Sequence, residues 1–204
     1  MGRFTGPRVK IMRALGVDLP GLSRKSMDRR PYPPGEHGRD RRGKASDFKR
    51  QLMEKQKLRF NYGIGERQFR RMFLEAATSR EPTGKKLLEL LERRLDNMVF
   101  RAGFAPTIPA ARQMVTHRHF TVNGKSVNIP SYRLKEGDVV TPREKSKDLS
   151  AINEALENPS LARPDWFSFD ETKKSAQVSS LPDSTSVPFE VDVQLVVEYY
   201  ATRI

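Results

Sequence analysis

The sequence changes character within one basic stretch, residues 112–133, which reads RQMVTHRHFTVNGKSVNIPSYR. Its first residues place apolar side chains at helical spacing, and those from Phe120 onward alternate apolar and polar around Asn123-Gly124. Asn-Gly is the strongest short signal for a β-hairpin, because both turn positions need a positive φ. We therefore predict a short helix after Thr107 that leads into a hairpin over residues 120–129.

Helical patterns lie on both sides of this stretch. The spacing predicts helices over residues 46–63, 66–78, 83–99 and 148–157. Ser46 supplies an N-terminal cap for the first of them. The second carries Phe69, Met72 and Ala76 at three-to-four spacing. Residues 191–200 fit a strand by alternation and a helix by three-to-four spacing, so periodicity leaves this last segment open.

The net charge of +13 comes from one part of the chain. Residues 1–145 hold 33 Lys or Arg against 15 Asp or Glu, whereas residues 146–204 hold 5 against 10. Lys and Arg in excess attract polyanions and release their condensed counterions on binding. A polyanionic partner is therefore expected for the first 145 residues.

Residues 1–45 are rich in Gly, Pro, Arg and Lys. Such a segment buries too little apolar surface to offset the entropy lost on ordering. We expect a basic irregular arm that becomes ordered on its partner. Its first residues lack the apolar core of a secretory signal, and Gly and Pro interrupt them, so neither export nor a transit peptide is expected.

Composition excludes several classes of protein. With no Cys among 204 residues, there is no disulfide scaffold, no thiolate zinc site and no Cys nucleophile. The apolar runs are far shorter than the roughly 20 residues that cross a membrane, so no membrane partner is expected.

Few side chains suit catalysis. The histidines are His37, His117 and His119, and none has the spacing of a zinc ligand set, so no metal or other cofactor is expected. Asp96 lies among arginines and is the one candidate for a catalytic base. An Asp this close to Arg94 is more often part of an internal ion pair, which is the interpretation we favour.

Side chains suited to RNA recognition crowd into the region from Arg94 to Arg133. On one helix, Arg94 and Arg101 would share a face opposite the leucines. Guanidinium, imidazole, amide and phenol groups together suit phosphate contact combined with base stacking. A solvated basic face is the alternative, and composition does not separate RNA from DNA. The candidate contacts in this region are Arg94, Arg101, Arg112, Gln113, His117, Arg118, His119, Asn123, Lys125, Tyr132 and Arg133.

Further cations of the arm and helices are candidates for phosphate neutralisation. They are Arg3, Arg8, Lys10, Arg13, Lys25, Lys55, Lys57, Arg59 and Arg67.

Several of these motifs resemble a known family. The stretches RLDNMVFR (94–101), ARQMVTHRH (111–119), VNG (122–124) and IPSY (129–132) are similar to the RNA-binding module named after ribosomal protein four of the small subunit. Outside the module, GPRVK (6–10), LPGL (19–22), PPGEHG (33–38), EKQKLRFNYG (54–63), ERQF (66–69) and QLVVEYY (194–200) resemble the bacterial-type ribosomal protein family itself. The resemblance covers nearly the whole chain.

This resemblance implies an α+β fold in which a mostly helical lobe carries an inserted small module of helix and antiparallel strands. The expected boundaries are 1–45 for the arm, 46–91 for the helical lobe, 92–158 for the module and 159–190 for a loop-rich connection. Residues 191–204 would return to the helical lobe, which makes 191–202 a helix. Trp166 and Phe167 are expected to anchor a loop of the connection by packing.

The resemblance also implies a non-enzymatic function. It is that of a structural small-subunit protein which binds a multi-helix junction in the five-prime domain of ribosomal RNA and helps nucleate assembly. The implied neighbours are ribosomal protein five, with which the family influences decoding accuracy, and incoming messenger RNA. The implied location is the ribosome of the cytoplasm, and an organelle stays open. Alternatives are an RNA-modifying enzyme or a free RNA chaperone with the same module.

One feature departs from many relatives. They carry a four-cysteine zinc knuckle between the LPGL and PPG motifs, whereas Ser23 to Arg30 bridge that interval here without cysteine. Zinc is therefore not carried over. The arm is expected to be ordered by RNA and neighbouring protein.

Overall fold

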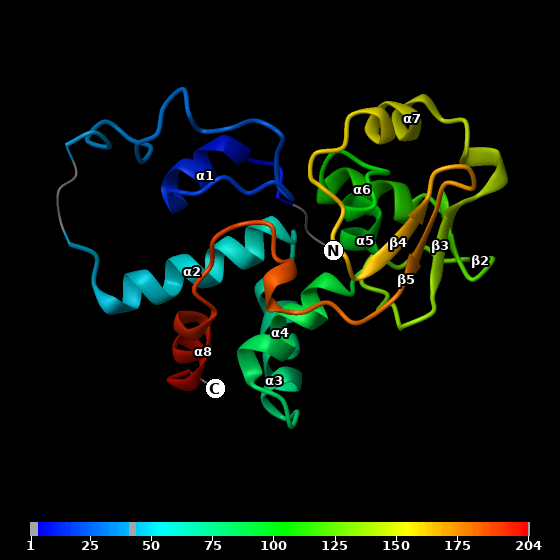
Figure 1. Cartoon of the computed structure of the whole chain (residues 1–204). Helices are drawn as coiled ribbons and strands as arrows, with labels where there is room; N and C mark the ends of the chain where they lie inside the picture. The colour runs from blue at the N-terminus through cyan, green and yellow to red at the C-terminus, as the bar shows by residue number, and fades with distance from the viewer. Residues whose placement is uncertain (1–3, 41–43, 204) are drawn as a thin grey trace. The chain divides into compact units, whose positions relative to one another are not determined.

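A computed structural model describes residues 4–40 and 44–203 and divides the chain into two units (Figure 1). The described residues of Met1–Leu87 and Phe189–Ile204 form a helical unit. Leu88–Pro188 form a second unit of helices and strands. The predicted α+β class is confirmed, and the helical unit combines segments far apart in the sequence.

Except for residues 8–15, the helices of the first unit follow the predicted pattern. They are α1 (Arg8–Leu15), α2 (Asp47–Asn61), α3 (Glu66–Ala77), the start of α4 (Thr83–Glu92) and α8 (Val193–Ala201). The Ser46 side chain caps α2 by accepting a hydrogen bond from the Lys49 backbone N–H at 3.3 Å. The apolar stripe Phe69, Met72 and Ala76 of α3 is buried, as predicted.

The segment that periodicity left open is the helix α8, as the resemblance implied. Asp192 caps it by accepting hydrogen bonds from the backbone N–H groups of Gln194 and Leu195. The helix packs against α2. Its buried Tyr200 stacks on Phe73 of α3, with ring centroids 4.6 Å apart. Packing against neighbouring helices therefore decides a segment whose own pattern is ambiguous.

A hydrogen-bond network joins α2, α3 and α8. The Tyr200 hydroxyl donates to Glu66 Oε1 at 2.7 Å, and Lys55 Nζ donates to Glu66 Oε2 at 2.8 Å. Partial burial acts to raise the pKa of Glu66, but the hydrogen bonds from Lys55 and Tyr200 outweigh it, and that pKa is lowered. Burial and the bond to Glu66 raise the pKa of Tyr200.

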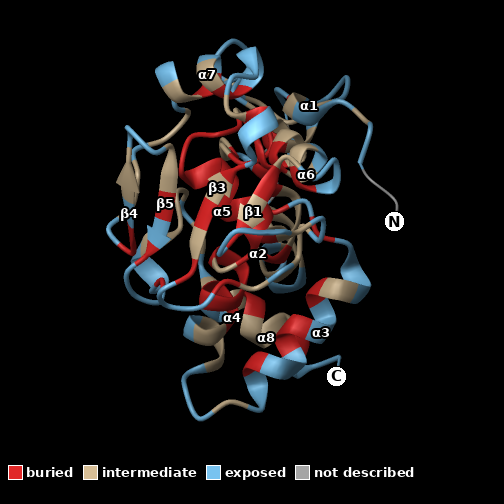
Figure 2. Ribbon diagram, turned by 90° about the vertical axis from the view of Figure 1, so that its right-hand side faces the viewer, coloured by how far each residue is buried: buried red, intermediate tan, exposed pale blue. Residues whose placement is uncertain are grey.

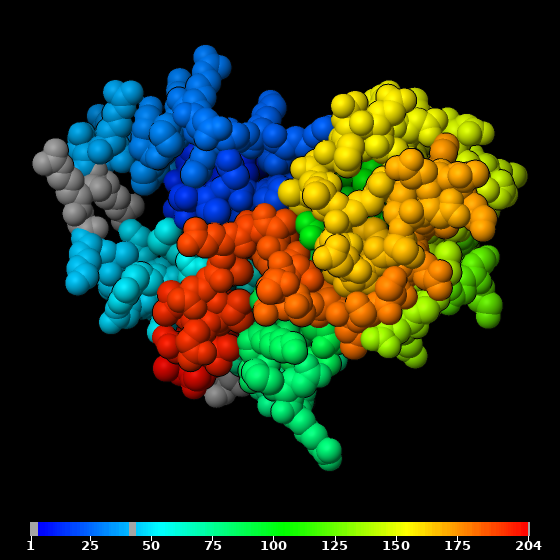
Figure 3. All heavy atoms as spheres, in the orientation of Figure 1, coloured from blue at the N-terminus to red at the C-terminus, as the bar shows by residue number. Residues whose placement is uncertain are grey.

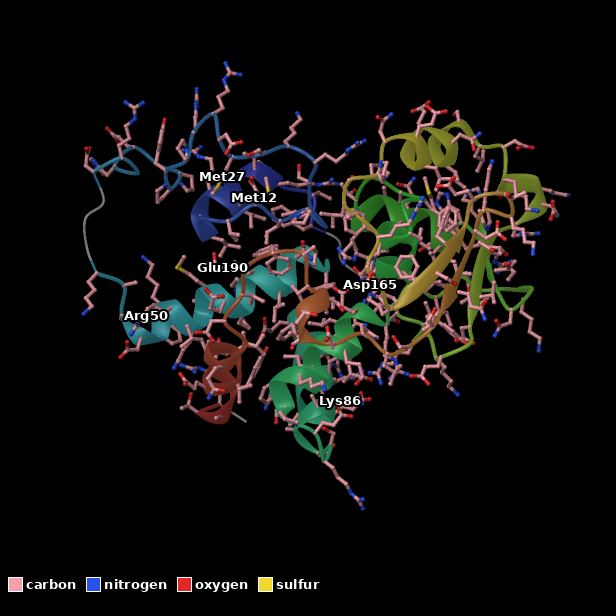
Figure 4. All side chains as sticks on the ribbon, in the orientation of Figure 1. Met12, Met27, Arg50, Lys86, Asp165 and Glu190 are labelled. Atoms are coloured by element: carbon pink, nitrogen blue, oxygen red, sulfur yellow. The ribbon has the colours of Figure 1, made fainter. Side chains whose placement is uncertain are left out.

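The arm is more ordered than the sequence predicted. Arg8–Leu15 form α1, which ends at Gly16 in the left-handed conformation, with a φ of 71°. Met12 and Leu15 of this helix form a buried apolar cluster with Leu19 and Leu22. Figure 4 labels Met12. Met53 and Phe60 of α2 pack against this cluster. The expectation of an irregular arm is wrong for residues 8–15, which form a helix whose apolar side chains pack with Leu19 and Leu22. The described residues 23–40 are turns and bends, as predicted.

Within the described residues, five antiparallel strands of the second unit form a sheet in the order β2-β1-β3-β5-β4. They are β1 (Phe120–Val122), β2 (Lys125–Ser126), β3 (Val139–Pro142), β4 (Phe167–Asp170) and β5 (Ser175–Val178). The predicted hairpin is confirmed, because Thr121 pairs with Ser126 and the turn residues Asn123 and Gly124 have φ of 50° and 76°. Strand β2 ends earlier than the alternation suggested.

Helices pack beside this sheet. They are the end of α4, α5 (Leu95–Arg101), α6 (Ile108–Thr116) and α7 (Ser150–Glu157), with short 3-10 helices η1 (Glu144–Ser146) and η2 (Ser184–Ser186). Thr107 caps α6 by accepting a hydrogen bond from the Ala110 N–H. α5 packs against α6. Figure 2 shows that buried residues concentrate in α5 and in β1 and β3, the core of this unit.

The structure adds detail to the sequence analysis at two places in the second unit. The single helix predicted over 83–99 is two helices, because Arg94 is extended (φ −70°, ψ 140°) between α4 and α5. The connection predicted to be loop-rich, 159–190, contains β4 and β5, and β5 extends the sheet by pairing with β3. These strands are too short for alternation to reveal them. Trp166 and Phe167 are buried edge to face, as predicted.

We expect the Glu66 network to make stability depend on acidic pH. A lowered folded pKa means that Glu66 stabilises the protein above its unfolded pKa, and that this contribution disappears as the pH falls below about 4.5. The Glu66→Gln variant should therefore lose less stability than the wild type between pH 7 and pH 3.5, as measured by urea unfolding. Equal losses in the two proteins would contradict this role.

Candidate RNA-binding surface

The break between α4 and α5 is stabilised by the loop that follows the β1–β2 hairpin, residues 130–134. The backbone N–H groups of Leu95 and Asp96 donate to the carbonyl oxygens of Tyr132 and Pro130, at 2.9 and 3.1 Å. The Leu134 N–H donates in turn to the Arg93 carbonyl at 2.9 Å. The first N–H groups of a helix lack partners within the helix, and here the loop supplies them. The loop is thereby fixed against the start of α5.

A buried ionic cluster lies at this junction. Arg94 donates to both carboxylate oxygens of Asp96, at 2.9 and 2.6 Å, and the Asn97 backbone N–H donates to one of them at 3.0 Å. Arg112 of α6 approaches the same carboxylate at 3.5 Å. Burial lowers the pKa of Arg112, while Asp96 opposes that effect. The Asp96 side chain is 0% exposed, so the internal ion pair favoured from the sequence is confirmed.

A second acid, Glu92, holds the far end of α5. The Asn97 side-chain amide donates to the Glu92 carboxylate at 2.9 Å, and Arg101 lies 3.8 Å from it. Arg101 also donates to the Ser186 carbonyl at 2.9 Å. The premise that Arg94 and Arg101 share an exposed helix face is wrong, because the helix is broken and both residues are buried. Their guanidinium groups hold the fold of this unit.

The exposed candidates lie where α6 passes into β1. Gln113, His117 and Arg118 are exposed, and Arg118 adopts a left-handed φ of 63° that turns the chain from helix to strand. The rings of His117 and His119 lie 6.1 Å apart. Arg112 keeps 20% of its side chain exposed. We call the polar and basic side chains between Arg112 and His119 the strip.

The remaining candidates of this unit lie in the hairpin turn and the loop after it. Lys125 is exposed, Tyr132 is 37% exposed and Arg133 is half-buried. Asn123 is exposed as a residue, but its amide serves the fold. It accepts a hydrogen bond from the Val139 N–H and donates to Asp138, both at 2.8 Å.

The candidates of the helical unit are similarly divided between surface and interior. Lys10, Lys25 and Arg67 are exposed. Lys55 is only 3% exposed and is bound to Glu66, so it is an interior group. Arg3 lies outside the described residues.

Four half-buried or tethered cations complete the set in this unit. Arg8 donates to the Leu22 carbonyl at 3.2 Å and Arg13 to the Tyr32 carbonyl at 2.9 Å. Lys57 pairs with Glu54 at 2.7 Å. Arg59 lies over the Phe60 ring at 4.5 Å. These four side chains are anchored by the helical unit.

Residues of the arm line an open basic hollow of about 390 Å³. Arg13, Lys25, Arg29 and Arg30 contribute cationic side chains to its lining. Asp18 fixes one wall, because its carboxylate accepts hydrogen bonds from the Ser26 hydroxyl at 2.7 Å and the Met27 N–H at 3.0 Å. Of the four cations, Arg29 and Arg30 were not among the predicted contacts.

The acid-rich end of the chain belongs largely to the second unit. Figure 3 shows residues from about 150 to 188, drawn yellow to orange, over much of its visible face. This segment carries most of the acids of residues 146–204. Among the described residues, no group of three or more His, Asp or Glu could hold a metal ion, and no helix is long and apolar enough to cross a membrane.

Comparisons with known proteins also divide the chain into two parts, close to the boundary between the helical unit and the second unit. Residues 3–92 match the family described as the ribosomal protein S4/S9 N-terminal domain, and residues 93–140 match the S4 domain. The chain is 60% identical to the small ribosomal subunit protein uS4 of Methylobacillus flagellatus, with both chains covered in full. The chain belongs to the uS4 family. A uS4B protein of Nitrosomonas europaea is 59% identical and uS4 of Lacticaseibacillus casei 49%, again over both full lengths.

The uS4 family is a structural family of the ribosome, not a family of enzymes. The alternative of an RNA-modifying enzyme therefore has no support. The boundary between the two matched domains, at residues 92 and 93, coincides with the end of α4 and the break at Arg94. The S4 domain match ends at residue 140, within β3, although β5 and β4 continue the same sheet.

Two exposed cations next to the strip were not among the RNA contacts predicted from the sequence. Arg143 and Lys145 follow β3, and the Arg143 N–H donates to the His119 carbonyl at 2.8 Å. Their signal was the alternation of basic residues at positions 143, 145 and 147. That pattern did not identify a site, because only the pairing of β3 with β1 brings residues 143–147 to His119.

Removing the Asp96 carboxylate should be severely destabilising. In Asp96→Ala, the buried Arg94 and the partly buried Arg112 lose their shared counter-charge, which typically costs about 3–5 kcal/mol. The free energy of urea unfolding measures the loss. Arg50→Ala is the control, since it breaks an exposed pair with Asp47 worth about 0–1 kcal/mol. Figure 4 labels Arg50. Similar losses in both variants would show that the buried cluster is dispensable.

Proposed function

We propose that this protein is a structural constituent of the small ribosomal subunit and binds the subunit's ribosomal RNA. Membership of the uS4 family carries the proposal, and the strip from Arg112 to His119 supplies a surface with the chemistry it needs. Guanidinium, amide and imidazole groups together contact phosphates and unstacked bases.

The charge distribution supports the same function. The excess of Lys and Arg lies within residues 1–145, which contain the basic hollow of the arm and the strip of the second unit. Cations at these sites neutralise phosphates, which fix the position of a protein on RNA without reading its sequence. The buried Arg94, Arg101 and Lys55 serve this binding indirectly, because they hold the elements that carry the exposed groups.

The bound RNA is, on this proposal, a multi-helix junction in the five-prime domain of small-subunit ribosomal RNA. Its capture helps nucleate assembly of the subunit. Ribosomal protein five is the proposed neighbour, with an influence on decoding accuracy, and messenger RNA passes nearby. The support for these specific partners is the resemblance of the motifs. The place of action is the ribosome in the cytoplasm.

The location of the protein tests the proposal directly. Sucrose-gradient sedimentation of a cell lysate should place the chain in small subunits at one copy per particle. A chain found mainly free in the lysate, or bound only to stalled ribosomes, would favour an RNA chaperone instead.

We expect the affinity for ribosomal RNA to depend steeply on salt. If six or more phosphates are neutralised, affinity falls by about 10³-fold or more between 50 and 200 mM salt. Filter binding of the purified protein to a transcript of the five-prime domain measures this slope. An affinity that is indifferent to salt would exclude phosphate neutralisation as the basis of binding.

The double substitution Arg112→Ala with His119→Ala should weaken binding of the same transcript. Both residues lie on the strip, and Arg112 brings a guanidinium that is still partly exposed. Circular dichroism checks that the variant is folded. Lys173→Ala is a matched control, because this lysine lies on the β4–β5 turn with 78% of its side chain exposed. Binding by the double variant equal to that of the control would show that the strip does not contact RNA.

A further inference from the structure

The turn after β3, residues 143–147, is fixed against the residues that precede β1. Strands β1 and β3 pair so that Phe120 lies opposite Pro142, which places His119 next to Arg143. The Arg143 N–H donates to the His119 carbonyl at 2.8 Å, and its guanidinium lies 3.4 Å from the Arg118 carbonyl. The turn therefore continues the strip at the end of α6.

The His119 side chain holds the same turn. Its Nδ1 atom forms a hydrogen bond of 3.0 Å with the Ser146 hydroxyl, and Ser146 is only 6% exposed. On the other side, Lys174 Nζ donates to the Lys147 carbonyl and to Asn153 Oδ1, both at 2.9 Å. Contacts from His119, which precedes β1, and from Lys174 of the β4–β5 turn thus restrain this short segment. A restrained segment loses little further entropy when it binds a ligand.

The turn presents cations to solvent. Arg143 and Lys145 are exposed, and the Arg143 guanidinium reaches the backbone of the exposed Arg118. Lys147 pairs with Glu144 at 2.6 Å, so one acid of the turn is already matched. Asp148, the next residue along the chain, is the other nearby acid in sequence. The excess of positive charge on the turn fits an anion such as the phosphate groups of an RNA backbone.

We propose that the turn at residues 143–147 is a second phosphate-contacting element, outside the S4 domain matched at 93–140. His119 acts in it as a positioning residue that fixes the turn through Ser146. This inference rests on the proposed binding of ribosomal RNA. It extends the contact surface to residues that neither the domain match nor the sequence motifs include.

The first experiment measures the salt dependence of binding to a transcript of the five-prime domain, with the full chain. Arg143→Ala combined with Lys145→Ala should reduce the slope of log affinity against log salt by about 1.4 to 1.8, because each lost phosphate contact removes about 0.7 to 0.9. Lys173→Ala is the control for loss of an exposed lysine outside the turn. A double variant whose slope equals that of the control would overturn the proposal.

The second experiment separates positioning by His119 from direct contact. The amide of His119→Asn can replace Nδ1 and keep the bond to Ser146, whereas His119→Gln places its amide near the Nε2 position and loses that bond. We expect His119→Asn to keep the wild-type slope, and His119→Gln and Ser146→Ala to reduce it. If Ser146→Ala keeps the slope while both His119 variants lose it, His119 contacts RNA directly and the positioning role is wrong.

Two further results remain informative. If Ser146→Ala lowers the melting temperature and leaves the slope unchanged, the bond is only structural and the positioning role fails. A wild-type protein that does not bind the transcript would contradict the proposed function itself. A wild type that binds, with the turn variants matching Lys173→Ala, would contradict only this further inference.

Discussion

One buried carboxylate, that of Asp96, holds the second unit in its shape. Arg94, the Asn97 backbone and Arg112 all approach it, so the break after α4, the start of α5 and α6 meet at a single negative charge. A buried carboxylate and a buried guanidinium are each costly alone, and each becomes tolerable through the other. The exposed strip at the end of α6 depends on this compensation, because α6 is placed by its contact with α5.

Local features of the fold could be predicted from the sequence. Ser46 caps α2, Thr107 precedes α6, and Asn123-Gly124 turns the hairpin, since each signal acts within a few residues of itself. The break at Arg94 could not be predicted, because the groups that satisfy α5 come from residues 130–134, some 35 positions later. The apolar cluster of the arm was missed for a similar reason, since part of its packing comes from α2.

The sequence also does not show which cations of the candidate site are exposed and which are buried. A count of Lys and Arg identifies an attraction for polyanions, but a guanidinium suits a carboxylate inside the protein as well as a phosphate outside it. Arg94 and Lys55 proved to be interior groups, whereas Lys10 and Arg118 are exposed. The positions of acids such as Asp96 and Glu66 in the fold decide which cations pair inside the protein and which stay at its surface.

The helical unit contains α8, whereas the second unit is one continuous segment of chain, Leu88–Pro188. During synthesis the chain emerges from its N-terminus, so the second unit is complete before α8 has been made. Lys55 and Glu66 are then already part of the chain, but Tyr200, which donates the second hydrogen bond to Glu66, has not yet been synthesised. Contacts between residues so distant in sequence form late in folding. The whole segment of the second unit is thus synthesised before the last helix of the helical unit, so the second unit can fold while the helical unit is still incomplete.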